Sequence, residues 1–378
     1  MPDEQITTDF EPEKPRPPRI ALVASRRTVS EYPLYLKFLL VGLADESVPV
    51  ILVCPPACDV DSIVPPAVEV VRHPALDMPL LERYNRRLLL NRLEKFQPDV
   101  LHCLCEVSAA RTRWLARHLN IPYLLNINSI PAHWHPIMLS TTRCANIIAP
   151  AKTIADHFAA AHPKFADRVR QINIGTFVET TTACFAHPER LPGIVVAPPL
   201  DNPAGLEKLF LAFHRLTIDG YQFIVALVTT GRSEGQLWKQ LRSLGLLRIV
   251  AVVPHRLGLY SAGSAADVFI VPRPSSSFNM LLLAAMGAGS VVAASKGGVD
   301  DLIIDEKTAL VFNPDDQLSV YNCLKRIFDA RETAQKIAAD AQQFLRQNHH
   351  VSDMVGSTLQ LYRQAAKFLQ PQTESPGV

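Results

Sequence analysis

Short apolar segments alternate along this chain with longer segments in which apolar residues recur every three or four positions. The first pair shows the pattern: Ile20–Ala24 is continuously apolar, and Pro33–Leu43 has the spacing of a helix. Continuous apolar runs of this length predict strands that are buried on both faces, as in a parallel sheet covered by helices. Because strands and helices alternate, the pattern predicts right-handed βαβ units and an α/β fold.

The amino-terminal half of the chain predicts one doubly wound domain. Its clearest helix is Leu80–Phe96, in which Leu81, Leu88 and Leu93 share one face. The other expected helices are Pro33–Leu43 and Ala109–Leu119. The expected strands are Ile20–Ala24, Val50–Val53, Val68–Val71, Val100–Cys105, Tyr123–Ile127 and Asn146–Ala149.

A stretch without apolar period, Glu179–Pro192, separates this half from a second half of the same kind. Helices are expected there from Gly205, Glu234 and Phe278, and Leu318–Phe368 is nearly all helical. The expected strands are Ile194–Ala197, Phe223–Val228, Ile249–Val253, Val268–Val271, Val291–Ala294 and Ala309–Phe312.

These patterns predict two doubly wound, Rossmann-like domains that face each other across a cleft. We expect a leader at 1–18, a first domain at 19–178, a linker at 179–192, a second domain at 193–350, and a final helix and tail at 351–378 that cross back to the first domain. Ligands of such sheets bind at the carboxyl ends of the strands, near helix N-termini whose free N–H groups suit phosphates. The architecture therefore favours a nucleotide or another phosphorylated ligand in the cleft.

Charge and composition narrow the classes of protein. The 378 residues carry 38 Lys and Arg against 36 Asp and Glu, which argues against a nucleic-acid binder. Seven cysteines without a CxxC set indicate free thiols in a reducing compartment. The acidic, proline-rich start predicts a disordered leader rather than a signal peptide, and no apolar segment approaches the roughly 18 residues that span a bilayer. We therefore expect a cytoplasmic protein.

No metal site or cofactor is expected. Histidines occur in pairs, His133 with His135 and His349 with His350, and such spacings point the two rings in different directions. A serine hydrolase is also not indicated, because the G-x-S-x-G sequence of a nucleophile elbow is missing.

Three consecutive segments carry a family resemblance. Ala265–Pro272, Leu282–Gly289 and Val291–Gly298 resemble the carboxyl-terminal signatures of the retaining, nucleotide-sugar-dependent glycosyltransferases of family four. The resemblance is strong from Leu257 to Asp316, and Pro98–His102 looks like a strand of the amino-terminal domain in that family. It implies a GT-B fold and a nucleotide diphosphate sugar as the donor substrate, without a metal.

The residues that carry the chemistry in that family are replaced here. The resemblance places the cations that neutralise the leaving phosphate at Pro199 and Ala204, neither of which has a charge. It places the glutamate that binds the ribose at Ala284 and the glutamate that faces the sugar at Ser276. An alanine cannot bind two vicinal hydroxyls, and a serine can make one weak contact with the sugar.

The amino-terminal domain departs from the family in the same way. Ser25–Ser30, which follows the first strand, has no glycine, and the histidine beside the donor sugar is replaced by Asn128. Arg26 and Arg27 either bind a phosphate across the cleft or lie in a solvated loop. Asn128 stands as a candidate sugar contact in place of the histidine ring.

Other candidate contacts keep two interpretations each. Ser275, Ser276 and Ser277 either cap the following helix or hold an anion with their N–H groups. Arg232 either contacts a phosphate or lies in a helix-capping loop. The basic helix over 83–95 is either a solvated face or a peripheral contact with anionic lipid.

Two functions therefore remain open. The chain is either a glycosyltransferase that transfers a sugar from a nucleotide sugar to an unknown acceptor, such as a polysaccharide or a lipid-linked one, or a catalytically inactive relative. An inactive relative would act as a binding, scaffold or regulatory module for a protein partner. If it is active, we expect Arg26, Arg27 or Arg232 to bind the phosphate and Ser276 to bind the sugar.

Overall fold

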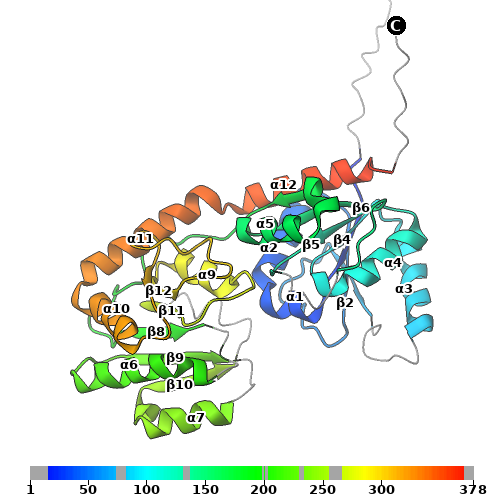
Figure 1. Ribbon diagram of the computed structural model, residues 1–378. Helices are drawn as coiled ribbons and strands as arrows, with labels where there is room; N and C mark the ends of the chain where they lie inside the picture. The colour runs from blue at the N-terminus through cyan, green and yellow to red at the C-terminus, as the bar shows by residue number, and fades with distance from the viewer. Residues whose placement is uncertain are drawn as a thin grey trace, which may run out of the picture.

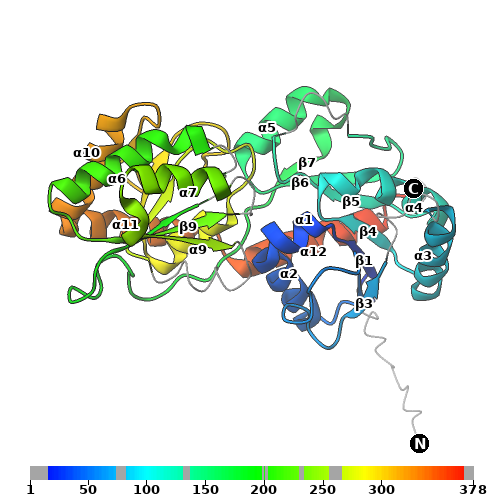
Figure 2. The same ribbon diagram turned by 90° about the horizontal axis from the view of Figure 1, so that it is seen from below.

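The molecule consists of two α/β halves, each built on a parallel sheet (Figures 1 and 2). The structure is a computed structural model, and it describes residues 16–73, 82–130, 137–197, 200, 203–229, 234–254 and 266–369. The two sheets are joined by the linker that follows residue 171 and by the final helices, which run along both halves in Figure 1.

The first sheet has the strand order β3-β2-β1-β4-β5-β6-β7. Strand β1 lies inside the sheet and is paired in parallel on both sides, so that Ile20 lies opposite Val50 and Val100. The strands are β1 (Ile20–Val23), β2 (Val50–Cys54), β3 (Glu69–Arg72), β4 (Val100–Cys103), β5 (Tyr123–Asn126), β6 (Cys144–Ala149) and β7 (Val169–Gln171). The helices are α1 (Arg26–Glu31), α2 (Pro33–Asp45), α3 (Glu82–Phe96), α4 (Ala109–Leu119) and α5 (Lys152–Ala161).

The second sheet has the order β10-β9-β8-β11-β12-β13. Its strands are β8 (Gly193–Val196), β9 (Ile224–Thr229), β10 (Val250–Pro254), β11 (Val268–Val271), β12 (Val291–Ser295) and β13 (Leu310–Phe312). Its helices are α6 (Glu207–Ile218), α7 (Glu234–Ser243), α9 (Met280–Ala288), α10 (Gln317–Asp329) and α11 (Arg331–Asn348). The strand-helix alternation and the parallel sheets predicted from the sequence are therefore confirmed.

One short helix replaces an expected loop. The segment after β1 forms α1, because Ser25 and Thr28 cap its first turn reciprocally: the Ser25 side chain accepts from the Thr28 N–H (3.1 Å), and the Thr28 side chain accepts from the Ser25 N–H (3.2 Å). The interpretation of Arg26 and Arg27 as residues of a solvated loop is therefore wrong. Both lie in α1, and Arg27 is half-buried.

The final helix α12 (Val351–Ala366) packs against α2 and strands β4–β6 of the first sheet. A buried polar network fixes it there. Asn126 Nδ2 donates to the Tyr35 hydroxyl (2.8 Å), so Asn126 Oδ1 must accept from His102 Nε2 (2.8 Å). His102 Nδ1 then accepts from the Tyr362 hydroxyl of α12 (2.6 Å). Burial lowers the pKa of His102 to about 4, which keeps the ring neutral.

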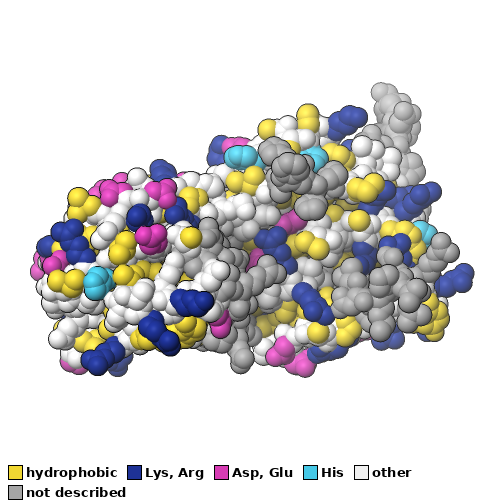
Figure 3. All heavy atoms as spheres, turned by 60° about the horizontal axis from the view of Figure 1, so that its bottom comes forward, with side chains coloured by type: hydrophobic (Ala, Val, Ile, Leu, Met, Phe, Trp, Pro, Cys, Tyr) yellow, Lys and Arg dark blue, Asp and Glu magenta, His cyan; other side chains and the backbone are white. Residues whose placement is uncertain are grey.

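The charged side chains of one face and the positions of the thiols can be described from the structure. Lys and Arg side chains are dispersed over both halves of the face in Figure 3. All seven cysteines are buried free thiols. Within the described part of the chain, no helix is both long enough and apolar enough to cross a bilayer.

Candidate functional site

The two halves meet where the loops after β5 and β11 pair with each other. Ser129 and Ser277 form an isolated antiparallel bridge. On either side of it, the Ile130 N–H donates to the Ser276 carbonyl (2.7 Å) and the Phe278 N–H donates to the Asn128 carbonyl (3.0 Å). Since both loops follow the carboxyl ends of their strands, this contact lies at the edge where the sequence predicts the ligand.

Arg27 makes three hydrogen bonds at the same junction, one of which crosses it. Its Nη2 donates to Ser277 Oγ (2.7 Å), its Nη1 to Glu106 Oε1 (3.0 Å) and its Nε to Glu31 Oε2 (2.7 Å). Burial alone would lower the pKa of Arg27, but the hydrogen bond with Glu31 and the charges of Glu31 and Glu106 outweigh it and raise that pKa. Arg27 is therefore a fixed cation whose charge two carboxylates already balance.

Glu106 organises the first-domain side of the junction. Besides Arg27, its carboxylate accepts from the Ser129 hydroxyl (2.7 Å) and from the Asn128 N–H (3.4 Å). The Asn128 side chain is buried and donates to the Leu104 carbonyl (2.9 Å). Sequence reasoning missed Glu106, although an acidic residue directly after the apolar run of the predicted strand Val100–Cys105 was a usable signal.

Buried side chains reinforce this contact. The Tyr32 hydroxyl lies 3.2 Å from the carbonyl oxygens of both Asn128 and Phe278, and it donates to one of them at a time. Burial raises the pKa of Tyr32, so its proton stays in place. Ile127 and Phe278 belong to one hydrophobic cluster that extends from the first domain into α9. The junction is therefore packed as a protein interior.

The serine loop of the second domain is held by its own bonds. Ser275 Oγ donates to the Ser277 carbonyl (3.0 Å) and accepts from the Ser277 N–H (3.1 Å), while the Val299 N–H donates to the Ser275 carbonyl (2.7 Å). Ser276 is exposed. The interpretation of the triplet as the cap of the next helix is wrong: α9 begins at Met280, and its cap is Asn279, whose Oδ1 accepts from the Leu282 N–H (3.0 Å).

The remaining candidate positions are spread along the second domain. Ala204 is exposed in the 3₁₀ turn Pro203–Leu206 before α6, and Ala284 is partly buried in the middle of α9. Pro199 and Arg232 lie outside the described residues. Arg26 is exposed in α1. In the described part of the chain, no group of three or more His, Cys, Asp or Glu side chains is placed to hold a metal ion.

One cation near this edge was not predicted. Arg273 follows β11 by two residues, and its Nε donates to the Gly205 carbonyl (2.8 Å). Its Nη1 donates to Asp315 Oδ1 (2.7 Å). No local sequence pattern marks Arg273, because its partners are 68 and 42 positions away along the chain.

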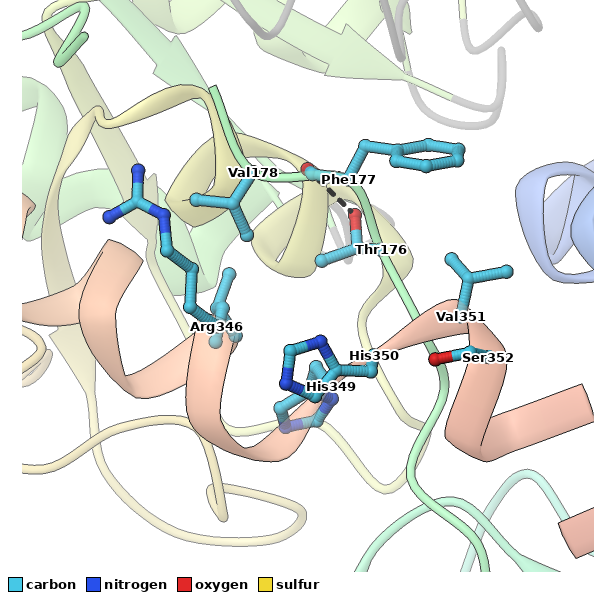
Figure 4. Close-up of a pocket in the computed structure, with 9 residues that line it drawn as sticks. Thr176, Phe177, Val178, Arg346, His349, His350, Val351 and Ser352 are labelled. Carbon is cyan, nitrogen blue, oxygen red and sulfur yellow. Dashed lines mark hydrogen bonds between the residues drawn. The ribbon is translucent and has the colours of Figure 1, made fainter. Parts of the chain in front are cut away.

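A separate pocket of about 410 Å³ lies where the linker passes the junction of α11 and α12 (Figure 4). It is lined by Thr176, Phe177, Val178, Leu345, Arg346, His349, His350, Val351 and Ser352. Buried His349 donates its Nδ1–H to the Ile174 carbonyl (2.8 Å), and burial lowers its pKa. None of the candidate residues lines this pocket, so we assign the candidate site to the junction of the two domains.

Comparison with known proteins gives the family. A model described as glycosyl transferases group 1 matches residues 192–330, and one described as glycosyltransferase family 4 matches residues 34–177. The chain belongs to the group 1, family four glycosyltransferases. The family resemblance seen in the sequence is therefore confirmed.

A curated relative agrees with this glycosyltransferase family. The sulfoquinovosyl transferase SQD2 of Arabidopsis thaliana is 24% identical over 280 residues, which are 68% of this chain and 54% of the relative. This chain thus spans about half the length of that relative.

Among solved structures, a glycosyltransferase from Rickettsia africae superimposes with a TM-score of 0.74 at 14% identity, over 93% of this chain and 99% of its own. Anabaena Alr3699/HepE in complex with UDP and glucose gives 0.73 at 14% identity, over 92% of this chain and 100% of its own. At these identities the structures establish the GT-B fold, with two Rossmann-like domains.

Proposed function

We propose that this glycosyltransferase-like protein binds a nucleoside diphosphate, free or carrying a sugar, at the carboxyl edge of the second sheet, and that it does not transfer the sugar. The ligand class comes from the family and from the fold neighbour of Anabaena, which has been solved with UDP and with UDP-glucose. In this proposal the protein is a cytoplasmic module that binds the nucleotide and acts on a protein partner, such as an active glycosyltransferase.

The pairing of the two loops is the observation that carries this proposal. The family resemblance places the donor sugar between the segment of Asn128 and the segment of Ser276. In this chain the two segments are hydrogen-bonded to each other through Ile130 and Phe278, and the Ser129–Ser277 bridge lies between those bonds. The sugar of a bound donor could lie between these two segments only if these bonds and the apolar packing around Phe278 were broken.

Charge at the junction supports the same conclusion. A departing nucleoside diphosphate needs fixed cations, and removal of one such electrostatic donor typically costs about 3 kcal/mol in the transition state, or at least a hundredfold in rate. Ala204 carries no charge, and Arg27 is already balanced by Glu31 and Glu106. We therefore expect transfer at or near the uncatalysed rate.

Active transfer of a sugar is the second candidate function. Arg273 favours it, because this cation lies beside the turn that contains Ala204. In that case the two loops must separate before the donor binds, and the acceptor is to be found by assay.

A donor panel distinguishes these functions. The full chain is incubated with UDP-glucose, UDP-galactose, GDP-mannose and ADP-glucose, and release of the nucleoside diphosphate is followed by a coupled assay. Calorimetry on the same preparation measures binding. We expect at least one nucleotide to bind and no release above the protein-free blank. Sustained release would support the second candidate instead, and failure of every nucleotide to bind would reject the proposed ligand class.

A further inference from the structure

Arg273 is held at the carboxyl edge of the second sheet by the turn that precedes α6. Its Nε donates to the Gly205 carbonyl (2.8 Å), and a Cβ atom placed on Gly205 would lie 3.2 Å from that Nε. The glycine thus lets the guanidinium approach the backbone of this turn closely. The side chain remains 30% exposed, so a ligand at the edge of the sheet can reach it.

This guanidinium lies next to a position where a charge is missing. Ala204 is the residue directly before Gly205, and it occupies the place where the family resemblance expects a lysine. Because Arg273 bonds to the backbone of the next residue, it brings a positive charge from the end of β11 to the turn after β8. The charge is therefore supplied by a different strand of the same sheet.

Asp315 competes with a ligand for this cation. The Arg273–Asp315 pair has an N···O distance of 2.7 Å, but the aspartate side chain is 73% exposed. Ion pairs at that exposure contribute little to stability and are screened by salt. The bonds of Arg273 to the described residues use Nε and Nη1, which leaves the two N–H groups of Nη2 for phosphate oxygens.

We infer that Arg273 binds the diphosphate group of the nucleotide and supplies, for binding, one positive charge where the family cations at Pro199 and Ala204 are missing. This inference rests on the proposed function, since it requires that a nucleoside diphosphate binds at this edge. When a diphosphate binds, its oxygens accept hydrogen bonds from the Arg273 guanidinium in place of Asp315. When the diphosphate dissociates, Asp315 pairs with Arg273 again.

Calorimetric titration of the full chain with UDP, GDP and ADP, and with UMP as a monophosphate, tests this assignment. For the diphosphate that binds the unchanged protein, we expect Arg273→Gln to weaken binding by at least tenfold, and Arg273→Lys by a smaller factor. We expect Asp315→Asn to tighten binding about threefold, because the competing carboxylate is gone. Binding of the monophosphate should change less than binding of the diphosphate in Arg273→Gln.

A matched control and a fold control complete the experiment. Arg326→Gln removes another exposed arginine of the second domain, which lies in α10 and pairs with Glu306 in the segment before β13, and it should leave the affinity unchanged. The thermal midpoint of each variant shows whether the domain is folded. Unchanged diphosphate binding by a folded Arg273→Gln overturns the role of Arg273 but leaves nucleotide binding standing. If the unchanged protein binds none of the three diphosphates, the proposed function fails first and the inference fails with it.

Discussion

Arg27 and Ser277 are 250 positions apart in the chain and are joined by a hydrogen bond of 2.7 Å between the two domains. The same guanidinium bonds to Glu31 and Glu106, so one side chain links α1, the loop after β4 and the loop after β11. The Arg27–Ser277 bond therefore helps to hold the two domains together: Ser277 would lose a charge-assisted bond if they separated, whereas Glu31 and Glu106 lie in the first domain and would stay with Arg27.

We predict that Arg27→Met destabilises the protein by about 2 kcal/mol, because Glu106, whose side chain is 15% exposed, loses its balancing charge. Ser277→Ala removes a single hydroxyl and should cost about 1 kcal/mol. Urea unfolding measures both changes. Small-angle scattering should show a larger radius of gyration for Arg27→Met than for Ser277→Ala. Equal and negligible effects of the two substitutions would mean that Arg27 does not hold the junction.

The close approach of Gly298 to Ser275 gives a second prediction. Gly298 has a φ of +68°, and a Cβ atom there would lie 2.2 Å from the Ser275 carbonyl oxygen. Gly298→Ala should therefore cost about 3 kcal/mol, since the added methyl group meets backbone in addition to the strained φ. Gly220 is the matched control: its φ is +88°, and nothing lies within 4 Å of its added Cβ. Gly220→Ala should cost about 1 kcal/mol, and thermal unfolding compares the two.

The buried network around His102 predicts a pH dependence of stability. The pKa of His102 is lowered to about 4 in the folded protein, against about 6.5 when the chain is unfolded. As the pH falls below 6.5, His102 becomes protonated in the unfolded chain, whereas in the folded protein it stays neutral until about pH 4. The free energy of unfolding should therefore decrease between these values, by about 3 kcal/mol from this residue. His349, whose pKa is also lowered by burial, adds to the loss with the same sign.

The His102 contribution is measured by difference. Denaturant unfolding is repeated from pH 7 to pH 4 with His102→Gln and with His157→Gln, which replaces an exposed histidine of α5. The first variant should be less stable at pH 7 and should lose less stability on acidification, whereas the second should follow the unchanged protein. Parallel curves for all three proteins would show that His102 is not the residue responsible.

The sequence was sufficient to predict the sheets, because strands covered on both faces are continuously apolar and leave a clear local pattern. The strand β7 was missed because Val169–Gln171 is a short edge strand without an apolar run. The helix α1 was missed because its signal lies in two small side chains, Ser25 and Thr28, rather than in apolar spacing.

The junction could not be predicted in the same way. The bonds of Arg27 to Ser277 and of Arg273 to Gly205 join residues far apart in the chain, and no spacing along the sequence encodes them. The sequence pointed to Arg27, Asn128 and Ser277, but it did not indicate that Arg27 would bond to Ser277 or that the segments of Asn128 and Ser277 would pair with each other. The family resemblance directed attention to a ligand, whereas the structure pairs these groups within the protein.

Cysteine cross-linking at the bridge tests most directly the claim that the two loops pair and close the sugar site. Ser129 and Ser277 form an antiparallel pair flanked by hydrogen bonds from Ile130 and Phe278, a geometry with Cα atoms about 4.5 Å apart, within the range of a disulfide. The seven native thiols are buried. The account predicts that S129C/S277C forms the disulfide rapidly under mild oxidation, at the same rate with and without saturating nucleotide sugar. A disulfide that fails to form, or that the nucleotide sugar prevents, would contradict it.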